Sequence, residues 1–422
     1  MTREPLFHIV TLGCRVNQYD EDRLRAEFRG RGFREVDLGG SPDVVVVNTC
    51  TVTHVADKKS RQLIRRALRE NPQARVIATG CAVGNRHALA RIPERVIQVA
   101  NRDKERLVDL VRAEIPEHHQ VASPGAGSVS FRARALLKVQ DGCDQFCSFC
   151  IVPFVRGRSR SRPVDEVMAE ARALVGAGLR ELVVTGVHVG AYGRDLEPPL
   201  GLGFLMRRLA EESGAERVRL SSIEPADFPM DLLDTMERTA VVCPHLHLAL
   251  QHASDRVLER MRRGYTRAHC EGIVSDFFRR FPDGALTADI LVGFPGEEDE
   301  DFDALCRLVE EIDFAHLHVF PYSPRPGTAA SRYPGRLSPE VMERRMIRIL
   351  DLGRRKEEAF RQRFVGRTVS VLVEATSDGW HKGTTDNYLS VRFEDAGTPV
   401  GDVRSVLVEA VLADGLQGRA VI

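Results

Sequence analysis

The sequence lacks an excess of charge of either sign. Its 60 basic and 60 acidic side chains give a formal net charge of +0, so the whole molecule cannot coat nucleic acid as a polycation. Any nucleic-acid site must therefore be a local patch. Lysine is scarce, since only six of the basic residues are lysines and 54 are arginines. Arginine suits planar contacts with phosphate, although such a skew is as often a compositional habit of a genome.

Long apolar runs, internal repeats and low-complexity tracts are also absent. No uninterrupted apolar run approaches the roughly 18 residues that would span a bilayer, so we expect a soluble, cytoplasmic protein with no membrane partner. The chain has 422 residues, of which 43% are hydrophobic and 28% charged, so it should fold. At about 150 residues per domain, it should form two or three domains.

Cysteine is too sparse for a disulfide scaffold. The chain has nine cysteines, and an odd number cannot all pair within one chain. Clustered cysteines in a reducing compartment more often hold a metal.

The alternation of apolar runs and charged stretches predicts an α/β protein. Residues 1–122 have short apolar runs at 8–13, 44–49, 75–80 and 96–100, separated by helix-like segments. Runs of this kind are typical of strands buried on both faces of a parallel sheet, so we expect a small doubly wound domain. A small-residue stretch at 123–128 then indicates a linker.

The rest of the chain predicts two further domains. Residues 129–362 contain six candidate strands with intervening helices, which favours a partial or complete (β/α) barrel. Ser338 and Pro339 have the chemistry of a helix start, and a long arginine-rich helix should follow. Residues 363–422 have β-like segments separated by turns, which predicts a small all-β barrel. The candidate strands lie at 135–140, 181–185, 217–221, 245–250, 286–292 and 316–320, then at 368–374, 388–393 and 403–411.

The sharpest motif is a CxxxCxxC formed by Cys143, Cys147 and Cys150, directly after a candidate strand. Three thiolates this close can hold three corners of a 4Fe-4S cluster and leave the fourth iron open. An open iron can chelate S-adenosylmethionine, which is the chemistry of radical SAM enzymes. The alternatives are a zinc loop or three unrelated cysteines, but zinc normally has a fourth Cys or His nearby.

A second cysteine set is dispersed along the first domain. Cys14, Cys50 and Cys81 each follow directly on a predicted strand. Because the carboxyl ends of parallel strands lie at one edge of a sheet, three successive loops can bring these thiols together. We expect a second cluster here, again with an open iron. The alternative is three buried structural cysteines, which is our interpretation of Cys243, Cys270 and Cys306.

Together the two cysteine sets resemble the methylthiotransferase family of radical SAM enzymes, over nearly the whole chain. The family has an amino-terminal domain with an auxiliary cluster, a radical SAM barrel and a carboxy-terminal TRAM barrel associated with RNA binding. The matching segments are TLGCRVNQY at 11–19, NTCTVT at 48–53, CSFCIVP at 147–153, RSRP at 160–163, GVHVG at 186–190 and DILVGFPGE at 289–297.

The resemblance implies two 4Fe-4S clusters and S-adenosylmethionine as cofactors. A 5′-deoxyadenosyl radical would take hydrogen from C2 of a modified adenine. The second cluster would supply sulfur, which a second S-adenosylmethionine would methylate. This chemistry is needed because an aromatic C2–H is too weak an acid for a side-chain base. The general radical SAM pattern also implies that Phe149, Thr185 and Gly186 line the cofactor.

The TLGCRVNQY start and the segments at 187–193 and 221–225 look most like the branch that modifies N6-threonylcarbamoyladenosine beside the tRNA anticodon. The expected partners are a tRNA anticodon loop, an electron donor and a sulfur source. Alternatives within the family are isopentenyladenosine tRNA or an aspartate of a ribosomal protein. An alternative of another class is a non-catalytic iron-sulfur protein that binds RNA or senses redox state.

Two features depart from the family pattern. His252 stands in LQHAS, where relatives usually have LQSGS, so the local contacts with a substrate should differ from those of relatives. The segment 363–422 has six basic and eight acidic residues, a poor electrostatic footprint for RNA. We therefore expect basic contacts from Arg156, Arg158 and Arg160 beside the cysteine loop. The arginines of the helix after Ser338 are a weaker candidate, because that helix is also rich in acidic residues.

Overall fold

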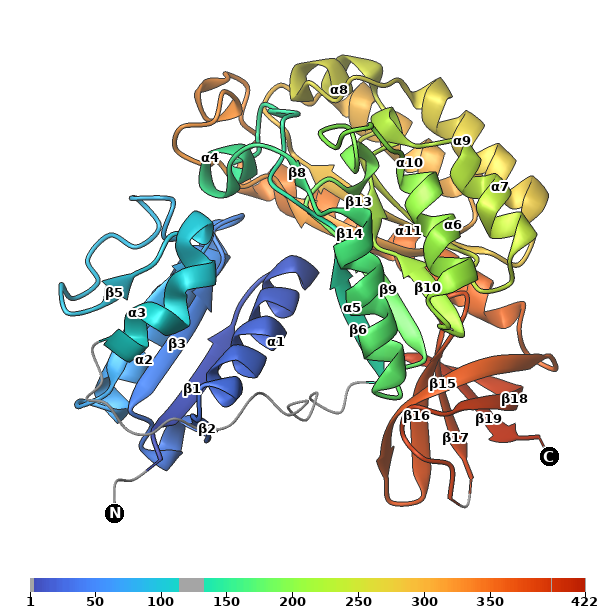
Figure 1. Ribbon diagram of the computed structural model, residues 1–422. Helices are drawn as coiled ribbons and strands as arrows, with labels where there is room; N and C mark the ends of the chain where they lie inside the picture. The colour runs from blue at the N-terminus through green and yellow to red at the C-terminus, as the bar shows by residue number, and fades with distance from the viewer. Residues whose placement is uncertain (1–3, 114–132, 396, 422) are drawn as a thin grey trace. The chain divides into compact units, whose positions relative to one another are not determined.

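The computed structural model describes residues 4–113, 133–395 and 397–421 (Figure 1). The chain divides into two compact units, which we describe separately. The first takes residues 1–131, 141–159 and 323–331, and the second takes 132–140, 160–322 and 332–422. The expected linker at 123–128 lies outside the described residues, and the three domain boundaries stay predictions.

The first unit contains a five-stranded parallel sheet with strand order β2-β1-β3-β4-β5. The four expected strands are present, and the two-residue β2 was not predicted. The elements are β1 (Leu6–Thr11), α1 (Arg15–Gly30), β2 (Arg34–Glu35), β3 (Val44–Thr49), α2 (His54–Glu70), β4 (Arg75–Gly80), β5 (Ile97–Gln98), α3 (Leu107–Ala113) and α4 (Val152–Arg156).

Helices cover both faces of this sheet, as a doubly wound fold requires. All six residues of β3 are buried, because β-branched valines pack well on a pleated surface with helices on both sides. Val44 and Val46 pack with residues of α1 and α3, whereas Val45 and Val47 pack with residues of α2. The first domain therefore has the predicted fold.

The second unit begins with the barrel-like region. Its elements are β6 (Arg134–Lys138), β8 (Arg160–Ser161), α5 (Val164–Gly176), β9 (Glu181–Thr185), α6 (Leu202–Glu212), β10 (Arg217–Leu220), β11 (Ser222–Ile223), α7 (Asp231–Arg238), β12 (His245–Gln251), α8 (Asp255–Met261), α9 (Arg267–Arg280), β13 (Ala285–Val292), α10 (Asp299–Glu311), β14 (Phe314–Pro321) and α11 (Pro339–Gln362); β7 is Gln140–Asp141.

The six predicted barrel strands are all present and parallel. They lie in two sheets, β10-β9-β6 and β11-β12-β13-β14, and the short β11 is an addition to the prediction. Alternate residues of the strands form one apolar core with the helices, which lie on the outer side of the strands (Figure 1). The expected partial (β/α) barrel is thus confirmed, with its sheet divided between β10 and β11.

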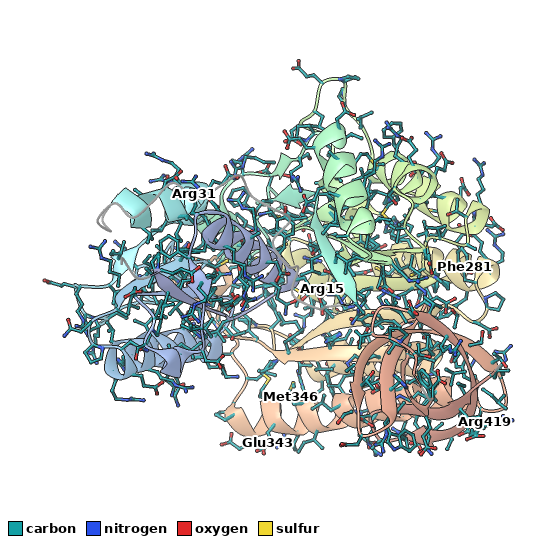
Figure 2. The ribbon with its side chains drawn as sticks, turned by 60° about the horizontal axis from the view of Figure 1, so that its bottom comes forward. Arg15, Arg31, Phe281, Glu343, Met346 and Arg419 are labelled. Atoms are coloured by element: carbon teal, nitrogen blue, oxygen red, sulfur yellow. The ribbon has the colours of Figure 1, made fainter. Side chains whose placement is uncertain are left out.

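Helix α11 begins as predicted, since the Ser338 hydroxyl accepts a hydrogen bond from the Val341 N–H and Pro339 occupies the first turn. In Figure 2, Met346 lies on the inner side of α11, where it packs on the core, and Glu343 lies on the outer edge. Among the described helices, none combines the length and apolar character needed to cross a membrane.

The chain ends in a closed five-stranded barrel of order β15-β16-β17-β19-β18. The three strands predicted from sequence correspond to β15 (Thr368–Ser377), β17 (Ser390–Glu394) and β18 (Val403–Leu412). β16 (Trp380–Thr385) and β19 (Gly415–Ala420) were not predicted, because their sequences WHKGTT and GLQGRA have too few apolar residues to form a periodic pattern. The expected small all-β domain is confirmed.

Two arginines of β10 attach this barrel to the parallel sheet. Arg217 donates to the carbonyl oxygens of Thr384 and Ser370 at 3.0 and 2.8 Å. Arg219 donates to those of Asp386 and Thr385 at 2.7 and 3.0 Å. Backbone carbonyls of β15 and of the end of β16 thereby accept hydrogen bonds from side chains of β10.

Arg219 is neutralised by Glu181 of β9, whose Oε1 lies 2.7 Å from the arginine Nε. Neither side chain has any exposed surface. Burial opposes the charge on Arg219, but the negative charge of Glu181 raises its pKa. A fully buried pair of this kind is costly to break, because the remaining charge would have no counter-ion.

We expect Glu181→Gln to lower the free energy of unfolding by about 3–5 kcal/mol, since it leaves the Arg219 charge buried and uncompensated. Urea denaturation followed by circular dichroism measures this loss. Glu212→Gln is the matched control, because Glu212 pairs with Arg172 at 3.2 Å in a partly exposed position and should change stability little. Equal losses in the two variants would contradict the proposed role of the buried pair.

Candidate functional site: two cysteine loops in one unit

The dispersed cysteines stand where the sequence predicts. Cys14 follows β1 and is the residue before α1, Cys50 follows β3, and Cys81 follows β4. These strands are neighbours in the sheet, and Thr49 of β3 pairs in register with Gly80 of β4. The three cysteines therefore lie at adjacent carboxyl ends along one edge of the sheet.

The three thiols are close enough to affect one another. Burial raises the pKa of Cys50 to about 12, and the negative charges at Cys81 and Cys14 add to the shift. Gly13 has φ +107°, and a Cβ there would lie 3.1 Å from the Cys50 Sγ. A glycine is thus required beside Cys50, since any side chain would fill the space next to its sulfur. Cys14 is exposed, whereas Cys50 and Cys81 are buried.

The CxxxCxxC segment forms an irregular loop, which closes where the Cys143 N–H donates to the Gly157 carbonyl at 3.1 Å. Gly142 has φ +72°, and a Cβ at this position would lie 1.9 Å from the Arg158 carbonyl oxygen. Phe146, between the first two cysteines, also has a positive φ of 48°. Cys147 is buried, and Cys143, Cys150 and Phe149 are half-buried.

The two cysteine loops adjoin within the first unit. Cys81 packs with Ile151 and Val155 in one small apolar cluster, and Ile151 directly follows Cys150. Asn101 donates to the Val155 carbonyl at 3.2 Å. The six predicted ligands thus belong to one compact unit.

A third segment contacts both loops and was missed from the sequence. The Ala330 N–H donates to the Ser148 carbonyl at 2.7 Å. Arg325 is buried, pairs with Asp57 and donates to the hydroxyl of Thr51, the residue after Cys50, at 3.1 Å. The sequence of this segment, SPRPGT at 323–328, indicates only a turn. Its contacts could not be predicted, because the partners of Arg325 lie more than 260 positions away.

Each predicted ligand set consists of three thiols, which are the donors that iron-sulfur clusters take. All nine cysteines lie in the described residues, and none forms a disulfide. Among those residues, no three Cys, His, Asp or Glu side chains converge tightly enough to hold one metal ion. Cys243, Cys270 and Cys306 are buried in the other unit.

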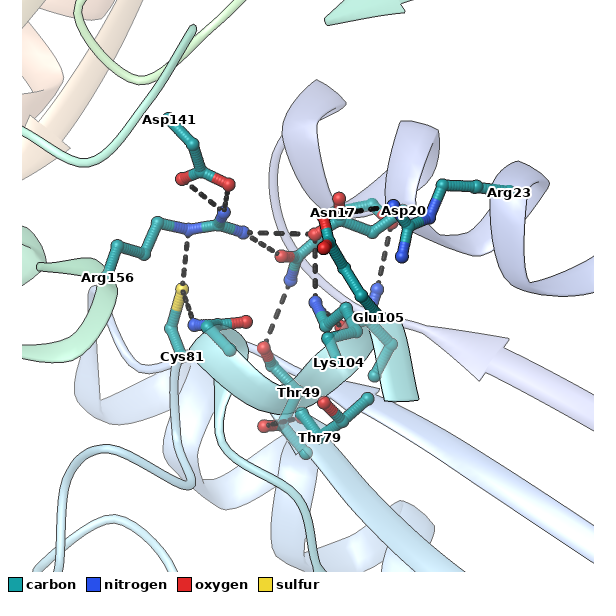
Figure 3. A network of polar contacts seen from close by, with 12 residues as sticks. Asn17, Asp20, Arg23, Thr49, Thr79, Cys81, Lys104, Glu105, Asp141 and Arg156 are labelled. Atoms are coloured by element: carbon teal, nitrogen blue, oxygen red, sulfur yellow. Dashed lines mark hydrogen bonds and ion pairs between the residues drawn. The ribbon is translucent and has the colours of Figure 1, made fainter. Parts of the chain in front are cut away.

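The three arginines expected to contact a ligand differ in exposure. Arg158 and Arg160 are exposed, and Arg158 pairs with Asp144 at 2.8 Å. Arg156 is instead buried, with 2% of its side chain exposed, and it donates hydrogen bonds to Cys81, Asp141 and Asn17 (Figure 3). The expected contact of Arg156 with a ligand at the surface is therefore wrong, because the protein itself occupies this guanidinium.

In the second unit, Thr185 ends β9 and is buried. A Cβ on Gly186 would lie 3.0 Å from both the Gln140 carbonyl oxygen and its side-chain Oε1. That Oε1 accepts hydrogen bonds from the N–H groups of Val187 and His188 at 3.1 and 2.8 Å. The turn after β9 is therefore fixed by Gln140, and its glycine permits this close approach.

The side chain of His252 is buried and contacts the loop after β13. It has no exposed surface, and its Nδ1 accepts a hydrogen bond from the Ser254 N–H at 3.0 Å. Its Nε2 lies 3.5 Å from a carboxylate oxygen of buried Glu297, and the same oxygen accepts the Gly293 N–H at 2.7 Å. His252 thus supports the loop after β13 and is not exposed to a substrate.

Comparison with known proteins gives the family. The profile of the "Radical SAM superfamily" matches residues 137–309, and that of "Uncharacterized protein family UPF0004" matches residues 6–100. A Bacillus subtilis protein named threonylcarbamoyladenosine tRNA methylthiotransferase MtaB is 35% identical over 420 residues, which cover 95% of this chain and 93% of the relative. The chain belongs to the radical SAM methylthiotransferase family. Members of this superfamily use S-adenosylmethionine and a 4Fe-4S cluster.

Other relatives carry a second name. A Corynebacterium efficiens protein named tRNA-2-methylthio-N(6)-dimethylallyladenosine synthase is 34% identical over 432 residues, covering 94% of this chain and 80% of the relative. Among solved structures, the radical S-adenosylmethionine methyltransferase TsrM from Kitasatospora setae has a TM-score of 0.58 at 15% identity, covering 90% of this chain and 81% of that one. This last similarity concerns the fold alone.

We expect iodoacetamide to alkylate Cys14 of the iron-free methylthiotransferase much faster than Cys50 or Cys81. Cys14 is exposed, and burial holds the other two away from reagent. Peptide mass spectrometry measures the labelling. Anaerobic loading with iron and sulfide should protect Cys14, whereas the buried control Cys243 should stay unlabelled before and after loading. Continued labelling of Cys14 after iron uptake would exclude it as a ligand.

Proposed function

We propose that this protein adds a methylthio group to C2 of N6-threonylcarbamoyladenosine at position 37 of tRNA, next to the anticodon. The observation that carries the proposal is the pair of adjoining cysteine loops. Cys81 of one loop packs against Ile151, which follows Cys150 of the other. Two adjoining loops that each carry three thiols can serve two successive steps on one substrate atom.

Cys143, Cys147 and Cys150 hold the radical SAM cluster in this proposal, and Cys14, Cys50 and Cys81 hold the auxiliary cluster. When bound, the first cluster supplies the electron that cleaves S-adenosylmethionine, and the second supplies a site for sulfur. Three ligands per cluster leave one coordination position for the cofactor or for sulfur. A side-chain base is not needed, because an aromatic C2–H is too weak an acid for one to remove.

The cofactor contacts stay those expected from the radical SAM pattern. Half-buried Phe149 precedes Cys150 and can contact the adenine of S-adenosylmethionine. Thr185 and Gly186 end a strand, and backbone groups near a glycine can approach the methionine portion closely. The role of Gln140 is to hold this turn through its bonds to Val187 and His188.

The proposed substrate is a single-stranded loop, because the target base must be unstacked before it can reach a buried site. Exposed Arg158 and Arg160 beside the cysteine loop are the candidate phosphate contacts. An electron donor and a sulfur source are required as further partners, since a reduction and a sulfur transfer both need an external supplier.

The choice of nucleoside rests on relatives and on motifs. Relatives from Bacillus subtilis, Chlamydia pneumoniae and Aquifex aeolicus, at 34–35% identity, carry the threonylcarbamoyladenosine name. The TLGCRVNQY start favours the same branch. Dimethylallyladenosine is the second candidate, because relatives with that name are 34% identical.

We expect anaerobically loaded wild-type protein to contain about eight irons per chain, from two 4Fe-4S clusters. Cys147→Ala should retain about four irons and lose formation of 5′-deoxyadenosine. Cys50→Ala should also retain about four, with cleavage of S-adenosylmethionine intact and methylthiolation lost. Iron analysis and chromatography measure these quantities, and Cys306→Ala is the control with a buried cysteine from the other unit. Four irons in the wild type would refute the second cluster.

We expect tRNA nucleosides from a deletion strain to lack 2-methylthio-N6-threonylcarbamoyladenosine and to accumulate its unthiolated precursor. Mass spectrometry of digested tRNA measures both. Expression of the wild-type gene should restore the product, and the Cys50→Ala gene should not. Loss of the methylthio group from isopentenyladenosine, with the threonylcarbamoyl nucleoside unchanged, would instead assign the protein to the second branch.

A further inference from the structure

Arg156 is bonded to both cysteine loops at once. It ends α4, six residues after Cys150. Its Nε donates to the Cys81 Sγ at 3.2 Å. Its Nη1 donates to both carboxylate oxygens of Asp141 at 2.9 and 3.1 Å, and Asp141 lies two residues before Cys143. The guanidinium therefore closes the radical SAM loop at its base and reaches a predicted ligand of the other cluster (Figure 3).

Arg156 also reaches the strand ends before Cys14 and Cys50. Its Nη2 donates to the Asn17 Oδ1 at 2.5 Å. The Asn17 amide in turn donates to the carbonyls of Leu12 at 2.6 Å and Thr49 at 3.0 Å. Leu12 lies two residues before Cys14, and Thr49 lies directly before Cys50. One side chain thus bonds the Cys81 thiol directly and, through the Asn17 amide, holds the backbone that leads to Cys14 and Cys50.

The charges around Arg156 are balanced only while it is present. Asp20 lies 3.6 Å from Arg156 and 2.8 Å from Lys104, both measured between nitrogen and carboxylate oxygen. Two cations and two carboxylates, Asp20 and Asp141, form this group, and Asp20, Lys104 and Arg156 are nearly fully buried. Loss of the arginine charge would leave two carboxylates and one cation beside the Cys81 sulfur.

A cluster gains one negative charge when it is reduced. A buried cation that donates an N–H to a ligand sulfur favours the reduced form, and so raises the reduction potential. Arginine suits this position because its planar fork directs N–H groups to three partners, whereas a lysine ammonium is a point charge. Asn101 adds a weaker contact, with its amide nitrogen 3.9 Å from the Cys81 Sγ.

We propose that Arg156 is the positioning residue that sets the reduction potential of the cluster held by Cys14, Cys50 and Cys81. It ties the ligand loop of that cluster to the radical SAM loop. This inference rests on the proposed function, because it requires the auxiliary cluster. It replaces the expectation that Arg156 contacts a ligand from solvent.

The test is a redox titration followed by electron paramagnetic resonance. The Cys147→Ala background is used so that only the auxiliary cluster contributes a signal. We expect Arg156→Gln to make the midpoint potential more negative, with at least a tenfold lower ratio of reduced to oxidised cluster at a fixed potential. That ratio corresponds to about 59 mV for one electron. Arg156→Lys keeps the charge and should shift the potential less.

Arg158→Gln is the matched control, since this exposed arginine on the same loop does not contact Cys81. The midpoint potential of the auxiliary cluster in this variant should equal that in the Cys147→Ala parent. Asp141→Asn removes a negative charge and should shift the potential in the opposite direction. If Arg156→Gln fails to load iron, the Arg156→Lys and Asp141→Asn variants still test the inference. Unchanged potentials in loaded variants would overturn the inference. About four irons in the otherwise wild-type protein would instead refute the proposed function.

Discussion

The parallel arrangement of β1, β3 and β4 is the constraint on which the rest of the site depends. Cys50 lies 36 positions after Cys14, and Cys81 lies 31 positions after Cys50. All three follow strands whose carboxyl ends share one edge of the sheet. That arrangement is maintained by burial of β3 on both faces, with its valines packed alternately on α1 and α2. A shift in strand register would move one thiol away from the other two.

Buried arginines then connect segments that are distant in the sequence. Arg219 joins the terminal barrel to the parallel sheet, Arg325 joins the 323–331 segment to α2, and Arg156 joins the two cysteine loops. Each is paired with a carboxylate, as a charge removed from water must be. Part of the arginine excess is thus structural, because a guanidinium can bond several backbone or side-chain acceptors from one position.

The sequence was sufficient for the features that depend on local pattern. Runs such as VVVVNT identify buried strands without reference to the rest of the chain, and each cysteine position follows from the strand before it. Arg156 was misjudged because its surroundings are set by Cys81 and Asn17, which are 75 and 139 positions away. The residues next to Arg156 in the sequence do not indicate that its side chain is buried. β16 and β19 were missed for a related reason, since a closed barrel stabilises strands with little apolar pattern of their own.

The burial of Arg156 also changes how recognition of an RNA partner has to be explained. Arg158 and Arg160 are exposed, but Arg158 already pairs with Asp144. The terminal barrel has more acidic than basic residues. Few phosphate contacts are therefore available from these two regions, and counterion release there would supply only a small part of the affinity. Selection of the proposed nucleoside must then depend on contacts with the unstacked base and its N6 substituent, which carry sequence information that phosphate contacts lack.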